Sequence, residues 1–132
     1  MAIVMQTTHR ALGDVVVLEP VGRIDYLVAA EFERTLMPLL EPGSGSQRGL
    51  VIDFAGVDYI SSVGLRVLMI ATRALRARGA RIAATGLQPA VQEIFSVSRF
   101  DRVIELFPTV HAALTAISPA AALAYGAERP AP

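Results

Sequence analysis

Two adjacent hydroxyl groups, on Ser61 and Ser62, are the side chains of this chain best placed to do chemistry. They follow the β-type segment 57–60 (VDYI) and precede a run with helical periodicity that starts near Gly64. A serine at the start of a helix can accept a hydrogen bond from a free backbone N–H of the first turn. It can also carry a phosphate, whose ~1.5 to 2 negative charges lie favourably near the positive end of the helix dipole. The two roles are compatible, and we expect Ser61 to cap the helix, which leaves the Ser62 hydroxyl available for a phosphate.

A nucleophilic role for Ser62 finds little support in its neighbours. Ser62 and Gly64 match half of the Gly-x-Ser-x-Gly motif of serine hydrolases, but position 60 is Ile rather than Gly. The two histidines, His9 and His111, have no sequence context that would make either a general base.

Other catalytic groups are no better supported. A paired-carboxylate site can be imagined from Asp53 and Asp58, but an aspartate at a strand end and one in a turn explain the pair better. All twelve basic residues are arginine and there is no cysteine, which excludes Schiff-base lysines, thiolate catalysis and sulfur-ligated metals. We therefore predict no catalytic residue, no metal ligand and no cofactor, in a chain that is not an enzyme.

Length and composition indicate one compact domain with a substantial core. The chain has 132 residues, of which 53% are apolar and 18% charged. Its formal net charge is zero, which argues against a nucleic-acid partner because phosphate binding relies on a basic excess. No segment approaches the ~18 consecutive apolar residues of a membrane span, and the N-terminus does not read as a signal peptide. We expect a cytoplasmic protein that does not insert into a membrane.

Strand-like and helical segments alternate from residue 49 onward, which is the pattern of a parallel sheet with right-handed crossovers. An opening hairpin adds an antiparallel edge. Strands are expected at 3–8, 14–24, 49–54, 81–86 and 102–107, and helices at 26–40, 62–78, 89–100 and 109–117. The predicted fold class is α/β: one domain, 1–117, with a mixed four- to five-stranded sheet and about four helices packed mainly on one side. The Ala- and Pro-rich C-terminal tail, 118–132, is expected to be flexible.

The helix that starts at Ser62 separates into two faces. At about 100° per residue, the core face comprises Gly64, Val67, Leu68, Ala71, Thr72 and Leu75. The opposite face, an arc of about 80°, comprises Ser62, Arg66, Met69, Arg73 and Arg76. Gly64 would let the helix lie close against the sheet, and Ser62 would then face solvent.

Four short motifs occur in an order that is typical of one protein family. They are Gly22-Arg23-Ile24-Asp25, Tyr59-Ile60-Ser61-Ser62-Val63-Gly64-Leu65, Gly86-Leu87-Gln88-Pro89-Ala90-Val91 and Phe95-Ser96-Val97-Ser98-Arg99-Phe100-Asp101. Each motif is weak alone. Together with the strand–helix alternation, the four motifs make the segment from about Val15 to Ile117 resemble the STAS domain family, specifically the small bacterial anti-sigma factor antagonists. The resemblance implies a STAS-like α/β domain.

The resemblance also implies a function without catalysis. Such antagonists bind an anti-sigma factor that is also a serine kinase, and so free the sigma factor. The kinase phosphorylates the serine at the helix start, which lowers the affinity, and a phosphatase restores it. Ser62 aligns with the phosphoacceptor, and Asp25 aligns with an acidic residue of the adjoining loop. The expected partner-binding surface comprises Asp25, Ser61, Ser62, Arg66, Met69 and Arg73.

The sequence departs from the family pattern beside the acceptor. Ser61 stands where many regulated members carry Asp, and Val63 replaces a common Ser or Thr, so that Ser61 is the alternative acceptor. Two other functions stay open: a non-signalling STAS subunit docked on an ABC-type lipid transporter, and a subunit of a stress-signalling assembly. Partner binding that survives Ser62→Asp would favour a fixed contact over a switch.

Overall fold

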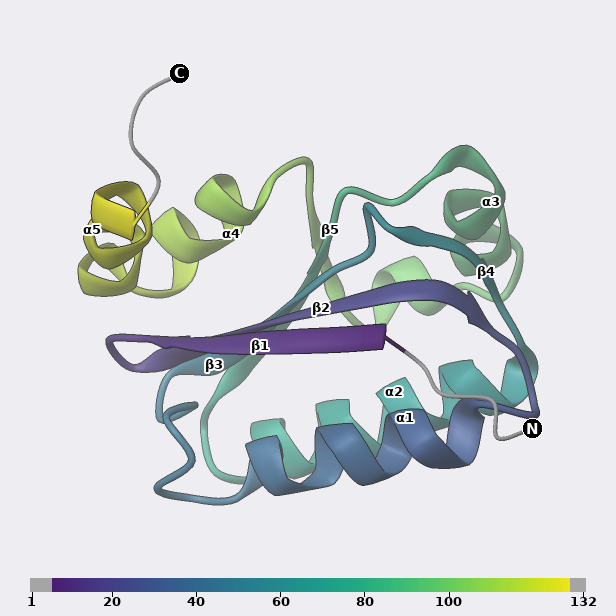
Figure 1. Cartoon of the computed structure of the whole chain (residues 1–132), viewed down its shortest axis with the longest axis horizontal. Coiled ribbons are helices and arrows are strands. Elements are labelled where there is room, and N and C mark those ends of the chain that lie inside the picture. Colours follow the sequence, from purple (N-terminus) through teal and green to yellow (C-terminus); the bar gives the residue numbers. More distant parts are fainter. Residues whose placement is uncertain (1–5, 129–132) are drawn as a thin grey trace.

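The computed structural model describes residues 6–128 of the chain, which form a sheet with helices on both of its faces (Figure 1). The strands are β1 (Gln6–Leu12), β2 (Val15–Ile24), β3 (Gly49–Asp53), β4 (Val57–Ile60), β5 (Arg81–Thr85) and β6 (Glu105–Phe107). The helices are α1 (Ala29–Leu36), α2 (Ser62–Ala77), α3 (Pro89–Val97), α4 (Val110–Ile117) and α5 (Pro119–Glu128), with short 3₁₀ turns η1 (Met37–Leu40) and η2 (Phe100–Arg102).

The sheet is mixed, as the sequence predicts. Its order is β1-β2-β3-β5-β6; β1 pairs antiparallel with β2, and the other pairs are parallel. The long strand β2 has two successive parallel neighbours, because Val15–Leu18 pairs with β3 and Gly22–Ile24 pairs with β4. The α/β class is confirmed, with six strands rather than four or five.

A change of register in β2 directs its last residues toward β4. The register shifts between Gly22 and Arg23, and Gly22 has a φ of 108°, a left-handed conformation that glycine adopts without steric cost. The Gly22 N–H donates to the Gly56 carbonyl at 2.9 Å, just before β4 begins. The turn after β3 and the end of β2 therefore converge on one edge.

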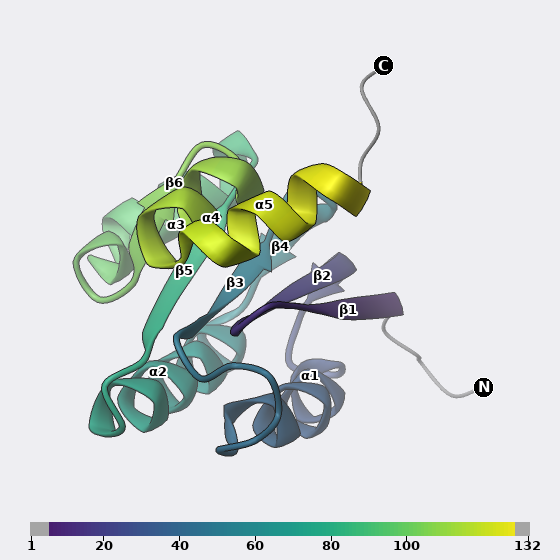
Figure 2. The same cartoon turned by 90° about the vertical axis from the view of Figure 1, so that its left-hand side faces the viewer.

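Two apolar cores lie on opposite faces of the sheet. The larger core, which includes Phe32 of α1 and Leu68 of α2, also takes Phe95 of α3. The smaller core lies under α4 and α5 and includes Leu114 and Ala121. Figure 2 shows α1 and α2 on one side of the sheet and α4 and α5 on the other. The prediction that the helices pack mainly on one side is therefore wrong. The uninterrupted apolar run of β3 and the fully buried run in the first half of β2 agree with burial on both faces.

Most of the expected flexible tail is a helix. Residues 119–128 form α5, whose Ala121 is completely buried and whose Tyr125 is 9% exposed. Ser118 caps this helix: its Oγ accepts from the Ala121 N–H at 3.2 Å and donates to Asp14 Oδ1 at 2.5 Å. Alanine is the strongest helix former, and its small side chain allows close packing, which explains the helix. Residues 129–132, and residues 3–5 of the first expected strand, lie outside the described part.

No helix within residues 6–128 combines the length and the apolar character that a membrane crossing requires.

Candidate functional site

The parallel pairing of β2 with β4 places two loops next to each other. Ile24 pairs with Ile60, and the Ser61 N–H donates to the Ile24 carbonyl at 2.8 Å. The residues that follow each strand, Asp25 in one case and Ser61 in the other, therefore leave the same edge of the sheet side by side. We call this surface the β2–α2 corner; it comprises residues 25–27, 61–63 and 66.

Ser61 is the N-cap of α2, as predicted. Its backbone is extended, with φ −83° and ψ 169°, and its Oγ accepts from the Gly64 N–H at 3.2 Å. Its carbonyl accepts the first intrahelical bond, from the Leu65 N–H at 2.9 Å. The Ser61 hydroxyl is therefore engaged in holding the helix start.

Ser62 is the first residue of α2 and is exposed. The six residues predicted for the core face are the six that the structure buries: Gly64, Val67, Leu68, Ala71, Thr72 and Leu75. With these residues turned inward, Ser62 and Arg66 are turned outward, and both are exposed. The helical periodicity thus predicts correctly that Ser62 is exposed at the start of α2.

Gly64 allows the start of α2 to lie directly on the sheet. A Cβ at this position would be 2.7 Å from Ile60 Cγ1 and 2.9 Å from Ile24 Cγ2, distances that real Cβ atoms essentially never show. Both isoleucines are buried at the ends of the paired strands. The rotation of α2 about its axis, and with it the outward direction of Ser62, depends on this close approach.

Asp25 has a structural role in addition to its place in the corner. Its Oδ1 accepts from the Leu27 N–H at 3.0 Å and from the Val28 N–H at 3.1 Å, and its carbonyl accepts from the Ala29 N–H at 3.0 Å. These bonds satisfy free donors of the turn that leads into α1. The half-buried Asp25 carboxylate therefore fixes the loop that presents residues 26 and 27.

The loop that Asp25 holds exposes two large apolar side chains that sequence reasoning missed. Tyr26 is 71% exposed and Leu27 is 56% exposed, and Val63 at the start of α2 is 43% exposed. Apolar side chains gathered at an exposed site are a feature of interaction surfaces. The signal in the sequence was the pair Tyr26-Leu27 directly after a turn-forming Asp, where polar residues are more usual.

Two of the predicted partner-binding residues lie further along α2. Met69 is half-buried and packs against the larger core, so only part of its side chain reaches the surface. Arg73 is exposed, about 16 Å along the helix axis from Ser62 at 1.5 Å per residue. The structure thus brings Asp25, Ser61, Ser62 and Arg66 together and leaves Arg73 outside the corner.

Comparison with known proteins identifies the family. A model of the STAS domain matches residues 3–113. The chain belongs to the STAS domain family. BtrV of Bordetella bronchiseptica, named as an anti-sigma factor antagonist, is 31% identical over 90 residues, which cover 68% of this chain and 72% of BtrV. RsfB of Mycobacterium tuberculosis, named as an anti-sigma-F factor antagonist, is 28% identical over 103 residues, which cover 78% of this chain and 81% of RsfB.

A solved structure shows the same STAS fold. The crystal structure of an anti-sigma factor antagonist from Mycobacterium paratuberculosis superposes with a TM-score of 0.76 at 25% sequence identity, covering 86% of this chain and 94% of that one. The family and the fold that the sequence motifs predict are therefore confirmed.

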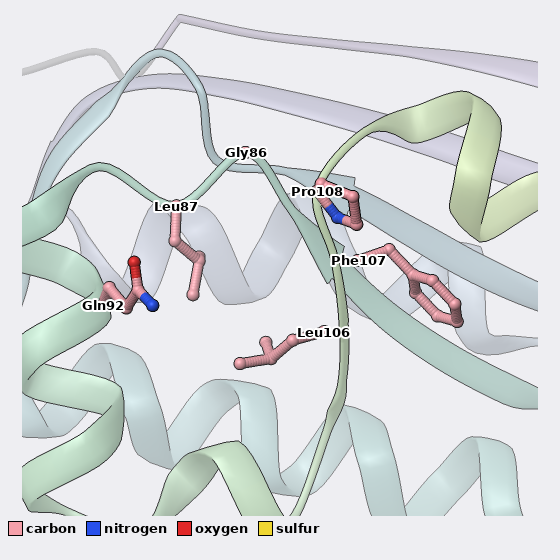
Figure 3. Close-up of a pocket in the computed structure, with 6 residues that line it drawn as sticks. All are labelled: Gly86, Leu87, Gln92, Leu106, Phe107 and Pro108. Carbon is pink, nitrogen blue, oxygen red and sulfur yellow. The ribbon is translucent and has the colours of Figure 1, made fainter.

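A hollow of about 420 Å³ lies at the carboxyl end of β5, and none of its lining residues belongs to the β2–α2 corner. Its lining is Gly86, Leu87, Gln92, Leu106, Phe107 and Pro108. Figure 3 shows Leu87, Leu106 and Gln92 directed into it and the Phe107 ring directed away. No lining residue is charged or nucleophilic, so the hollow offers no group for acid–base or covalent chemistry.

Among the residues considered for catalysis, Asp53 has a structural role and the two histidines lie outside the β2–α2 corner. Asp53 Oδ1 accepts from the Ala55 N–H at 3.0 Å, which is the turn role that the sequence favours. His9 lies on β1 and His111 on α4, neither of which contributes to the β2–α2 corner. Among the described residues, no three His, Asp or Glu side chains gather as metal ligands would.

Proposed function

We propose that this STAS domain is an anti-sigma factor antagonist of the cytoplasm. It binds an anti-sigma factor through the β2–α2 corner and thereby frees a sigma factor. The two relatives that carry this name cover at least 68% of the chain, which supports the assignment. No catalytic residue of this chain takes part: it acts by binding.

We further propose that the anti-sigma factor is a serine kinase and that Ser62 is its substrate. The γ-phosphoryl group of ATP passes to the Ser62 Oγ, the hydroxyl proton leaves to a base of the kinase, and ADP is released. A phosphatase returns the serine by hydrolysis, with inorganic phosphate as the second product. The observation that carries this proposal is that the two serines differ in their contacts: Ser61 Oγ accepts a hydrogen bond that holds the helix start, while Ser62 is exposed.

The corner explains how one phosphate would oppose binding. Tyr26 and Leu27, in the loop after β2, and Val63, in the first turn of α2, are exposed apolar side chains that a partner can bury. A phosphate on Ser62 adds ~1.5 to 2 negative charges beside this surface, and burying an unpaired charge of that size is costly. The helix itself tolerates the phosphate, because its N-terminal dipole favours an anion.

A capture experiment tests the proposal. The tagged chain, Ser62→Ala, Ser62→Asp and the control Thr115→Asp, which changes an exposed residue of α4 on the opposite face, are used to capture proteins from the native cell. We expect the wild type, Ser62→Ala and Thr115→Asp to recover an ATP-binding anti-sigma factor, and Ser62→Asp to recover much less. Equal recovery by Ser62→Asp would refute the switch. Recovery of lipid-transporter subunits or of a stress-signalling assembly in place of an anti-sigma factor would refute the assignment itself.

A further inference from the structure

We propose that Arg66 is the intramolecular partner of the phosphate on Ser62, so that phosphorylation also withdraws the Arg66 cation from the docking surface. This inference rests on the proposed phosphoacceptor and deepens its regulation. Ser62 and Arg66 are four residues apart on α2, which places their side chains on one face with Cβ atoms about 5–6 Å apart. Both residues are exposed.

The Arg66 guanidinium is available for such a contact. Over residues 6–128 it makes no hydrogen bond and no ion pair, whereas Arg76, further along the same helix, donates to the Val103 carbonyl at 2.6 Å. The 16 residues of α2 include no Asp or Glu that could compete for Arg66 on the helix surface. An unpaired arginine one turn from the acceptor serine is thus the cation that a new phosphate meets first on its own helix.

The chemistry of the pair favours a strong contact. A phosphate offers three acceptor oxygens, and a guanidinium binds such oxygens through two parallel N–H donors. Asp25, the neighbouring anion of the corner, forms no ion pair with Arg66 within residues 6–128, and its Oδ1 is engaged by two N–H groups of its own loop. The Gly64 N–H is likewise taken, by Ser61 Oγ. Arg66 is therefore the mobile donor that can follow the phosphate.

A contact between Arg66 and the phosphate would weaken partner binding in two ways. In the unmodified chain, Arg66 stands free at the corner and suits a carboxylate on the partner's surface. In the phosphorylated chain, the partner meets a new anion and also loses access to the cation. Arg66→Gln alone should therefore weaken the unphosphorylated complex, and phosphorylation should weaken the complex by a smaller factor in the Arg66→Gln background than in the wild type.

A titration of the isolated chain tests the contact without a kinase. Phosphoserine is installed genetically at position 62, and the phosphate is titrated by ³¹P NMR at low salt. A nearby cation favours the dianion, so we expect the phosphate pKa to be about 0.3–0.6 unit lower in the wild type than in Arg66→Gln. The matched control, Arg73→Gln, removes an exposed arginine that also makes no hydrogen bond or ion pair within residues 6–128 and should leave the phosphate pKa unchanged. Asp25 and Asp58 are present in all three proteins, so their effects cancel.

Equal phosphate pKa values in the wild type and Arg66→Gln, or the same rise in Arg73→Gln, would overturn the inference. Thermal unfolding of the three phosphoproteins shows whether each is folded under the conditions of the titration. This result is independent of the proposed function: a failed titration leaves Ser62 as a possible kinase substrate. Failure of any kinase to modify Ser62 would remove the function but leave the titration unaffected.

Discussion

Replacing Gly64 by alanine tests whether α2 is held against the sheet as the structure has it. The added Cβ would be 2.7 Å from Ile60 Cγ1 and 2.9 Å from Ile24 Cγ2, about 1 Å inside the optimal separation of two carbon atoms. Both contacts are with branched atoms of buried side chains, which have little room to move. Overpacking of this kind costs about 1–3 kcal/mol, whereas alanine gains about 1 kcal/mol over glycine in a helix. We expect a net loss of roughly 0–2 kcal/mol in the free energy of unfolding.

A second glycine in a helix provides the matched control. A Cβ at Gly126 of α5 would meet no atom within 4 Å, so Gly126→Ala should keep the helix gain and raise stability by about 0.5–1 kcal/mol. Urea denaturation of Gly64→Ala and Gly126→Ala measures both changes, and their difference, about 1–3 kcal/mol, isolates the cost of the close contact. If Gly64→Ala were stabilised as much as Gly126→Ala, α2 would not lie as close to the paired strands as we describe, and the outward direction of Ser62 would lose its basis.

Three further substitutions address local features. Ser61→Ala should lower the free energy of unfolding by about 1 kcal/mol because a cap is lost, while Ser62→Ala should change it by less than about 0.5 kcal/mol; equal effects in urea denaturation would contradict the assignment of the cap. Hydrogen bonds from Arg81, at 2.6 and 2.9 Å, hold the pKa of Glu105 in the folded chain below its ordinary value. The ion pair therefore stabilises the fold at a pH above the pKa that Glu105 has in the unfolded chain, and this contribution is lost as the pH falls through the lowered pKa of the folded chain. Glu105→Gln should therefore flatten the acid side of the melting temperature against pH, and an unchanged profile would show that the pair contributes nothing. Ser118→Ala leaves the buried Ala121 N–H in the first turn of α5 without its acceptor and removes the hydrogen bond to the half-buried Asp14, and should cost about 1–3 kcal/mol; a loss below about 0.5 kcal/mol would mean that α5 does not depend on this hydroxyl.

Segments in which apolar residues recur at a regular spacing could be predicted from the sequence. In α2, large apolar residues recur at helical spacing, so the core face was correct at every position from Gly64 to Leu75. The cap at Ser61 was predictable because serine competes well for free N–H groups at a helix start. Both are local properties of a continuous segment.

The parts that depend on long-range packing could not be predicted. The helix α5 is built largely from alanine, whose weak hydrophobicity gives no clear apolar stripe, and its burial depends on contacts with α4 and β1. The face of the sheet that each helix covers is likewise not encoded in any single segment. Tyr26 and Leu27 become part of a site only because Ile24 pairs with Ile60, two residues far apart in the chain.

The affinity of the chain for its anti-sigma factor, with and without a phosphate on Ser62, is the most direct test of the account. Isothermal titration with the captured anti-sigma factor compares the unmodified chain with chain that carries phosphoserine only at position 62. We predict a Kd at least about tenfold higher for the phosphorylated chain, a difference of about 1.4 kcal/mol in binding free energy. Equal Kd values for the two forms would contradict the claim that Ser62 is the switch on the docking surface.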